Sequence, residues 1–150
     1  LFLKVFFQNK KLECIMAVNG NTVIALLPMK GFSERVPNKN LKNFNGKPLY
    51  HRVLNTLLKC DLIDQVIINT DGDNIKKDVD LNFRGERIKI HDRPENIQGD
   101  YVSMNKIIEY DLNHSSSDIY LQTHSTNPLI KLDSIVRGIK SYNKILNDNT

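Results

Sequence analysis

The chain has 150 residues, of which 40% are hydrophobic and 25% charged, with a formal net charge of +4. This length suits one compact domain, and the composition supplies a core while excluding a disordered or fibrous chain. The two cysteines, Cys14 and Cys60, form neither a disulfide framework nor a metal-binding spacing, and no apolar run could span a bilayer. We therefore expect a cytoplasmic protein with reduced thiols.

The two ends of the chain differ from the rest. Residues 1–15 fail as a signal peptide, because Lys4 interrupts the apolar run and no small-residue cleavage site follows. Since Met16 is a candidate start, we expect residues 1–15 to be a non-native extension. The chain stops just after a predicted helix, so residues 16–150 are expected to be an incomplete single domain.

From Thr22 onward, short apolar runs alternate with helical patterns. Continuous or alternating apolar residues predict four strands, at residues 23–27, 65–70, 87–91 and 118–122. The third alternates polar and apolar residues, which indicates a more exposed strand. This order of elements predicts an α/β fold with a mostly parallel, Rossmann-like sheet and helices on both faces.

Helical spacing of apolar residues predicts four helices. The first two span residues 49–60 and 73–81. We expect Asp100 to cap the third, with four residues on its buried face: Met104, Ile107, Ile108 and Leu112. The last carries a core stripe of Leu132, Ile135, Val136, Ile139 and Tyr142.

Ligands of open α/β sheets bind beyond the carboxyl ends of the strands. Four segments fall there in this chain: residues 28–48, 70–74, 92–103 and 123–130. The first is strongly cationic, with one acid, Glu34, against Lys30, Arg35, Lys39, Lys42 and Lys47. Such a loop favours a bound polyanion, either a nucleoside triphosphate or a nucleic acid.

The cationic segment matches neither common phosphate-binding motif. Pro48 follows Gly46-Lys47 where a P-loop needs Ser or Thr, and Leu41 occupies the position of its first glycine. The chain also lacks a G-x-G-x-x-G. A Walker A site and a dinucleotide-binding site are therefore both disfavoured.

The run from Val23 to Leu49 resembles the signature of the acylneuraminate cytidylyltransferases (CMP-sialic acid synthetases), roughly I-P-A-R-G-G-S-K-R-I-P-x-K-N-I-K-x-x-x-G-K-P-L. Eleven positions agree in register: Pro28, Gly31, Ser33, Arg35, Pro37, Lys39, Asn40, Gly46, Lys47, Pro48 and Leu49. Met29, Phe32 and Glu34 depart from it.

Three later segments resemble the same family in the same order. Asn69-Thr70-Asp71 is similar to an S-T-D at the end of the second strand, and the stretch from Arg93 to Met104 is similar to R-P-x-E-L-A-x-D-x-A-S-S. Residues 121–129 resemble L-Q-P-T-S-P-L-R, with two extra residues after Gln122. The resemblance thus covers nearly all of the predicted structure.

The resemblance implies a nucleotide-diphospho-sugar transferase type of fold, truncated at its C-terminus, and specific roles for the matched residues. Lys30 and Lys39 would grip the triphosphate as catalytic residues. CTP would be bound by Leu27, Met29, Gly31, Ser33, Arg35, Asn40, Arg93, Val102 and Ser103. The sugar acid would be bound by Gln122, Thr126 and Asn127, and the extra residues, including His124, are where substrate identity should differ.

The implied reaction is transfer of CMP from CTP to a sialic-acid-like sugar acid, with Mg²⁺ (or Mn²⁺) on the phosphates. Metal ligands and homodimer contacts are expected beyond Thr150. Three alternatives stay open: a nucleotidyltransferase for another sugar such as 3-deoxy-manno-octulosonate, an inactive nucleotide-binding fragment, and a nucleic-acid binder. The last is disfavoured, because Phe32 and Phe44 offer a weak stacking platform.

Overall fold

The computed structural model describes residues 4–6 and 20–148. Cys14, Met16 and most of the expected extension lie outside the described residues. A sheet is formed by β1 (Lys4–Phe6), β2 (Val23–Leu26), β5 (Gln65–Thr70), β6 (Ile88–Asp92) and β7 (Ile119–Gln122). The helices are α1 (Leu49–Leu58), α2 (Asp73–Asn82), α3 (Met104–Asn113) and α4 (Leu132–Asp148).

The strands lie in the order β1-β7-β2-β5-β6. The last four are parallel, with Ile24 opposite both Gln65 and Tyr120, and β1 adds an antiparallel edge to β7. The connections run from β2 outward to β5 and β6, and then return past β2 to β7. The predicted α/β class and mostly parallel sheet are confirmed, whereas the antiparallel β1 was not predicted.

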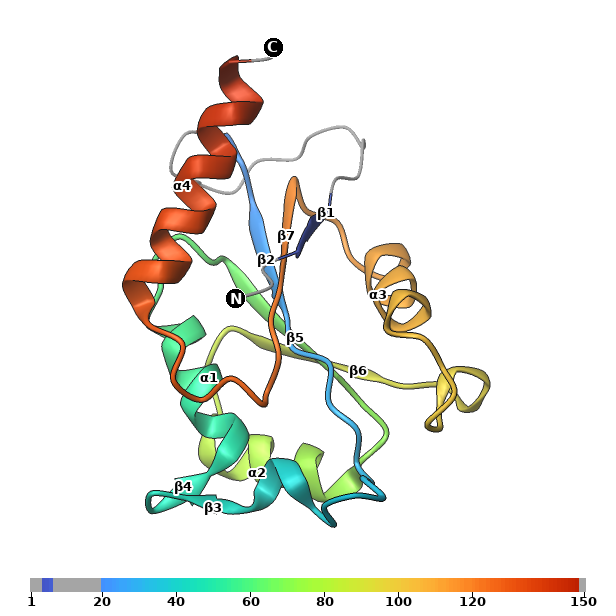
Figure 1. Ribbon diagram of the computed structural model, residues 1–150. Coiled ribbons are helices and arrows are strands. Elements are labelled where there is room, and N and C mark those ends of the chain that lie inside the picture. Colours follow the sequence, from blue (N-terminus) through green and yellow to red (C-terminus); the bar gives the residue numbers. More distant parts are fainter. Residues whose placement is uncertain (1–3, 7–19, 149–150) are drawn as a thin grey trace.

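Alternation along the strands sends side chains to two separate cores. Val23 and Ala25 of β2 face the larger cluster, to which α1, α2 and α4 contribute. Ile24 and Leu26 face the smaller cluster, which is closed by Ile108 of α3. Figure 1 shows α1 and α4 on one side of the sheet and α3 on the other, as the prediction of helices on both faces requires.

The start of the third helix was predicted wrongly. α3 begins at Met104 with Ser103 at its N-cap, so Asp100 does not cap it. Asp100 instead lies beside Lys30, because an ammonium group within reach binds the carboxylate more strongly than a helix end four residues away. Met104 is 36% exposed and does not belong to the buried face, whereas Ile107 and Ile108 are buried as predicted.

A small hairpin inside the cationic segment was not predicted. Its strands are β3 (Asn43–Phe44) and β4 (Lys47–Pro48). The turn residues Asn45 and Gly46 both have positive φ, at 51° and 85°. An Asn-Gly pair is the usual solution for such a turn, because its backbone twist matches that of the two strands.

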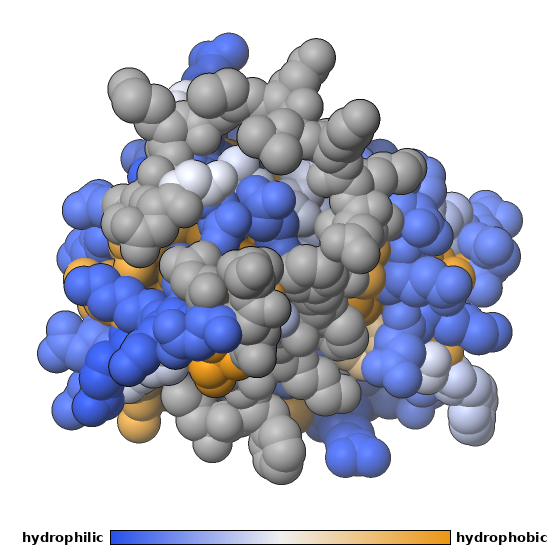
Figure 2. Space-filling view, turned by 90° about the horizontal axis from the view of Figure 1, so that it is seen from above, coloured by the Kyte–Doolittle hydropathy of each residue, from blue (hydrophilic) through white to orange (hydrophobic). Residues whose placement is uncertain are grey.

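Figure 2 views the molecule from the end at which the strands of the sheet begin, and part of this face is not described. Figure 2 shows hydrophilic side chains around this end, with smaller hydrophobic areas between them. In the part of the chain that the structure describes, none of the helices is both long and apolar enough to cross a membrane.

Candidate nucleotide-binding crevice

The topology places one crevice at the carboxyl ends of β2 and β7. These strands are neighbours, yet the chain leaves β2 toward one side of the sheet and reaches β7 from the other. The strand order therefore reverses between β2 and β7, and open α/β sheets bind ligands beyond the carboxyl ends of the strands at such a reversal. The loops after β2, β5, β6 and β7 are the four segments selected from the sequence.

The backbone after β2 continues along β5 before it enters the crevice. The amide nitrogens of Leu27 and Met29 donate to the carbonyl oxygens of Ile67 (2.8 Å) and Asn69 (2.9 Å). The side chains of Leu27 and Met29 are 0% and 2% exposed and belong to the larger core cluster. Their predicted contact with CTP is therefore limited to backbone atoms.

Two glycines let the loops after β2 and β5 touch through their backbones. A Cβ atom on Gly31 would lie 2.4 Å from the Cα of Gly72, and one on Gly72 would lie 2.6 Å from the Cα of Gly31. The Gly31 amide also donates to Asp71 Oδ1, at 2.7 Å. Gly31 was predicted from the matched motif, but Gly72 was not, because its requirement is a tertiary contact between two loops.

Arg93 lies beneath the crevice and is only 3% exposed. Its Nε donates to Asn69 Oδ1 (2.8 Å), and its Nη2 donates to the carbonyl oxygens of Met29 (3.1 Å) and Asn69 (2.9 Å). Its Nη1 is buried without a hydrogen-bond partner in the described structure, 3.8 Å from Asp71 Oδ1. Burial lowers the pKa of Arg93, and the carboxylates of Asp71 and Asp111 oppose this shift.

A buried network of side-chain hydrogen bonds extends from Asn69, the partner of Arg93, to α3. Asn69 Nδ2 donates to Asp111 Oδ1 at 2.7 Å, and His91 Nδ1 lies 2.7 Å from the same oxygen. Asp111 is 0% exposed and His91 6%. The His91 imidazole is therefore packed between the sheet and α3, where Asp111 satisfies its Nδ1.

Lys30 forms an ion pair with Asp100 beside the crevice. Its Nζ lies 2.5 Å from Asp100 Oδ1, with the two side chains 33% and 40% exposed. This contact lowers the pKa of Asp100, which is therefore ionised at neutral pH. Lys39 begins the short η2 helix (Lys39–Leu41) and is half-buried. Within the described residues, no ion pair holds the Lys39 ammonium group.

The other predicted CTP contacts differ in accessibility. Arg35 and Ser103 are exposed, and Ser33 and Val102 are half-buried. Asn40 is 5% exposed, because η2 turns it inward. The exposed and half-buried groups are free to meet a ligand in the crevice, whereas the amide of Asn40 is bonded to protein atoms on both sides.

The loop after β7 holds the predicted sugar-binding residues. Gln122 is 3% exposed at the end of the strand, Thr126 is exposed and Asn127 is half-buried. His124 is exposed at the surface of the same loop. Ile130, which stands where the family pattern has an arginine, is 8% exposed and packs in the larger core cluster.

The described residues do not form a metal site by themselves. Among them, no group of three or more His, Cys, Asp or Glu side chains could hold a metal ion. Two carboxylates beside the crevice are already engaged, Asp71 by the Gly31 amide and Asp100 by Lys30. A metal ion here would need further oxygen ligands, such as those of a triphosphate.

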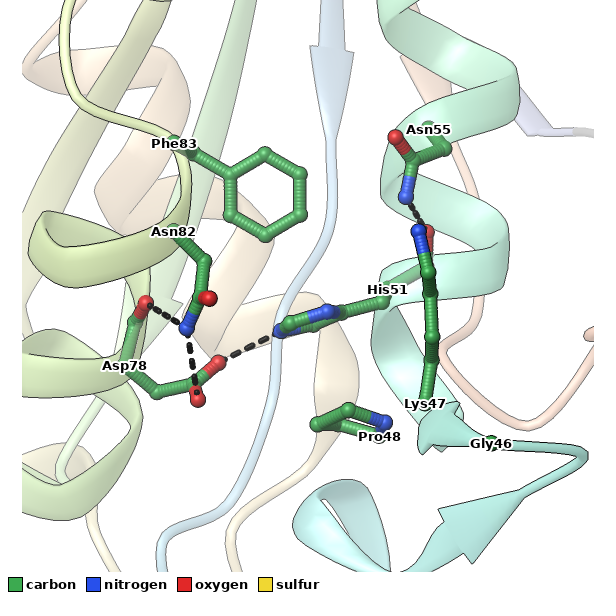
Figure 3. A pocket seen from close by; sticks show the side chains of 8 residues that line it. All are labelled: Gly46, Lys47, Pro48, His51, Asn55, Asp78, Asn82 and Phe83. Carbon is green, nitrogen blue, oxygen red and sulfur yellow. Dashed lines mark hydrogen bonds and ion pairs between the residues drawn. The ribbon is translucent and has the colours of Figure 1, made fainter.

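A pocket of about 340 Å³ lies between the hairpin, α1 and α2, outside the crevice. Figure 3 shows Asp78 of α2 on one side of the pocket, facing His51 of α1. His51 Nε2 lies 2.5 Å from Asp78 Oδ2, and the Tyr50 hydroxyl donates to the same oxygen. Burial and Asp78 raise the pKa of Tyr50 well above its usual value. This cluster therefore joins the two helices.

We expect the Asp78→Ala variant to lose about 1–3 kcal/mol of unfolding free energy, because the buried Tyr50 hydroxyl keeps no acceptor there. Urea denaturation measures this loss, and Asp80→Ala, an exposed change on the same helix, is the control. Nucleotide affinity should stay unchanged in the folded protein. A stable Asp78→Ala variant that has lost nucleotide binding contradicts the separation of this pocket from the crevice.

Comparison with known proteins assigns the fold and the family. The family model described as cytidylyltransferase matches residues 24–150. A pseudaminic acid cytidylyltransferase of Campylobacter jejuni is 25% identical over 124 residues, which cover 79% of this chain and 52% of that protein. N-acylneuraminate cytidylyltransferase B of Danio rerio is 32% identical over 107 residues, which cover 71% of this chain and 24% of that protein.

A solved structure shares the fold. The structure of CMP:2-keto-3-deoxy-manno-octonic acid synthetase complexed with CTP aligns with a TM-score of 0.65 and 20% identity, covering 80% of this chain and 48% of that one. This likeness confirms the Rossmann-like fold of nucleotidyltransferases. The chain spans about half the length of the Campylobacter relative and of this solved structure.

Proposed function

The chain belongs to the cytidylyltransferase family, and from that premise we propose that it forms the nucleotide-binding part of an enzyme that transfers CMP from CTP to a sugar acid. One observation carries the proposal. The cationic loop that matches the family motif leaves β2 at the crevice between β2 and β7, with Lys30 and Lys39 on it. A triphosphate requires cations and backbone N–H groups at such a point.

In the proposed reaction, the anomeric hydroxyl oxygen of the sugar acid attacks the α-phosphorus of CTP. A new P–O bond forms, the bond to the β-phosphate breaks, pyrophosphate leaves, and the hydroxyl proton passes to solvent. Catalysis then depends on in-line positioning and on neutralising the phosphate oxygens. Lys30 and Lys39 would supply positive charge to the leaving pyrophosphate. Mg²⁺, when bound to the phosphates, would neutralise further charge.

The acceptor is proposed only as a class. The relatives and the solved structure are named for pseudaminic, N-acylneuraminic and 3-deoxy-manno-octulosonic acids, which are all sugar acids. We propose a sialic-acid-like acceptor, with Gln122, Thr126 and Asn127 as its contacts, and 3-deoxy-manno-octulosonate as the alternative. A homodimer and a cytoplasmic location complete the proposal.

Calorimetric titration of the chain with CTP and Mg²⁺, with ATP and GTP as comparisons, tests the proposal directly. We expect a preference for CTP, and at least about tenfold weaker CTP binding in the Lys30→Ala and Lys39→Ala variants, since each removes a charge-assisted contact. Lys77→Ala, an exposed lysine of α2, is the control and should bind normally.

Three outcomes would contradict parts of this proposal. Absence of CTP binding by the folded chain would reject the nucleotide site. Normal binding by both lysine variants would reject their role at the triphosphate. If CTP binds but no sugar acid yields pyrophosphate, the chain is a nucleotide-binding module only.

A further inference from the structure

A buried hydrogen-bond chain connects the loop after β7 to the loop after β2. The Ser125 hydroxyl donates to Asn40 Oδ1 at 2.7 Å, and Asn40 Nδ2 donates to the carbonyl oxygen of Lys30 at 2.9 Å. Ser125 is 7% exposed and Asn40 5%. Because both bonds are shielded from water, breaking either one leaves a buried polar group without a partner.

Hydrogen bonds hold the loop after β7 on both sides of Ser125. The backbone amide and the hydroxyl of Thr123 both approach the Leu26 carbonyl oxygen, at 2.9 and 3.3 Å. Further along, the Asn127 amide donates to the His124 carbonyl oxygen at 3.1 Å, which closes a turn around Ser125. These hydrogen bonds therefore fix the position of Ser125 relative to β2.

On this geometry, and resting on the proposed function, we infer that Ser125 and Asn40 are positioning residues for Lys30. Together they hold the Lys30 backbone, and hence the origin of its side chain, at the triphosphate end of the crevice. Ser125 lies in the two-residue lengthening between Gln122 and Thr126. The sequence pattern suggested that this lengthening sets sugar specificity, whereas its buried serine acts on the nucleotide side.

The inference predicts which ligands respond to loss of the link. A shift of the Lys30 backbone moves its ammonium group away from the β- and γ-phosphates, which CTP has and CMP lacks. We expect the contacts to the base and ribose not to depend on this link. A change at Ser125 should therefore weaken CTP binding and leave CMP binding unchanged, which a general loosening of the crevice would not do.

The test is calorimetric titration of Ser125→Ala with CTP and with CMP. We expect CTP affinity to fall about fivefold, within the range of a typical net hydrogen bond, and CMP affinity to change less than twofold. Asn40→Ala should have at least the same effect. The double variant should bind CTP no more weakly than Asn40→Ala alone, because both substitutions break the same series of hydrogen bonds. Ser125→Cys, a weaker donor of similar size, is a second variant should the alanine variant not fold.

Ser117 provides a matched control at the opposite end of the same strands. It is also 7% exposed, and its hydroxyl donates to the Thr22 carbonyl oxygen at 2.9 Å. Ser117→Ala should not change CTP affinity. Equal weakening of CTP and CMP by Ser125→Ala, or no change in either, overturns the inference. Failure of the unmodified chain to bind CTP overturns the proposed function itself, so the two failures are distinguishable.

Discussion

Replacing Gly72 by alanine should abolish measurable CTP binding and destabilise the fold. The new Cβ would lie 2.6 Å from the Gly31 Cα, a distance at which the backbones must separate. Overpacking of this kind costs about 1–3 kcal/mol, and a loop displaced by 1 Å can cost about a hundredfold in activity. Gly31→Ala should behave in the same way, since its Cβ would meet the Gly72 Cα at 2.4 Å.

Gly85→Ala separates steric overlap from backbone strain. Gly85 has a φ of +83°, and a Cβ there would meet no atom within 4 Å. Its replacement should cost about 1–2 kcal/mol from strain alone and leave CTP binding intact. Gly72 has a φ of −97°, which any residue can adopt, so the effect there is one of space. Calorimetry and urea denaturation measure both effects, and tight CTP binding by Gly72→Ala would contradict the loop contact.

Periodicity predicted the fold well, because the core depends on it. β5 (Gln65–Thr70) coincides with its predicted range, and α2 (Asp73–Asn82) ends one residue beyond it. The hairpin was missed because its strands have two residues each, too few for an alternating pattern. Asn45-Gly46 was the signal that could have revealed it.

The candidate site was predictable where a motif defines it and unpredictable where tertiary contacts do. The cationic loop was located by charge and by resemblance. Gly72, Ser125 and Asp111 carry no local signature, because their partners lie 41, 85 and 42 residues away in sequence, at Gly31, Asn40 and Asn69. The Asp100 prediction failed for the same reason, since its partner Lys30 is 70 residues away.

Arg93→Met should remove about 3–5 kcal/mol of unfolding free energy and eliminate CTP binding. The guanidinium group joins the ends of β2 and β5 through three hydrogen bonds, to Met29 and twice to Asn69. Its loss leaves buried acceptors without donors and Asp71 without its cationic neighbour, which is the costly way to break a buried charge pair. Arg93→Lys should also fail, because an ammonium group keeps the charge but cannot make the planar fork of contacts.

Arg87 offers a matched arginine away from the crevice. Its Nη2 donates to the carbonyl oxygens of Leu58 (2.7 Å) and Cys60 (2.9 Å), at the C-terminal end of α1. Arg87→Met should lower stability without changing the CTP affinity of the folded fraction. If Arg93→Met and Arg87→Met lose stability alike and both bind CTP normally, Arg93 only supports the fold. Selective loss of CTP binding in Arg93→Met instead means that the strand ends must be joined for the crevice to hold a nucleotide.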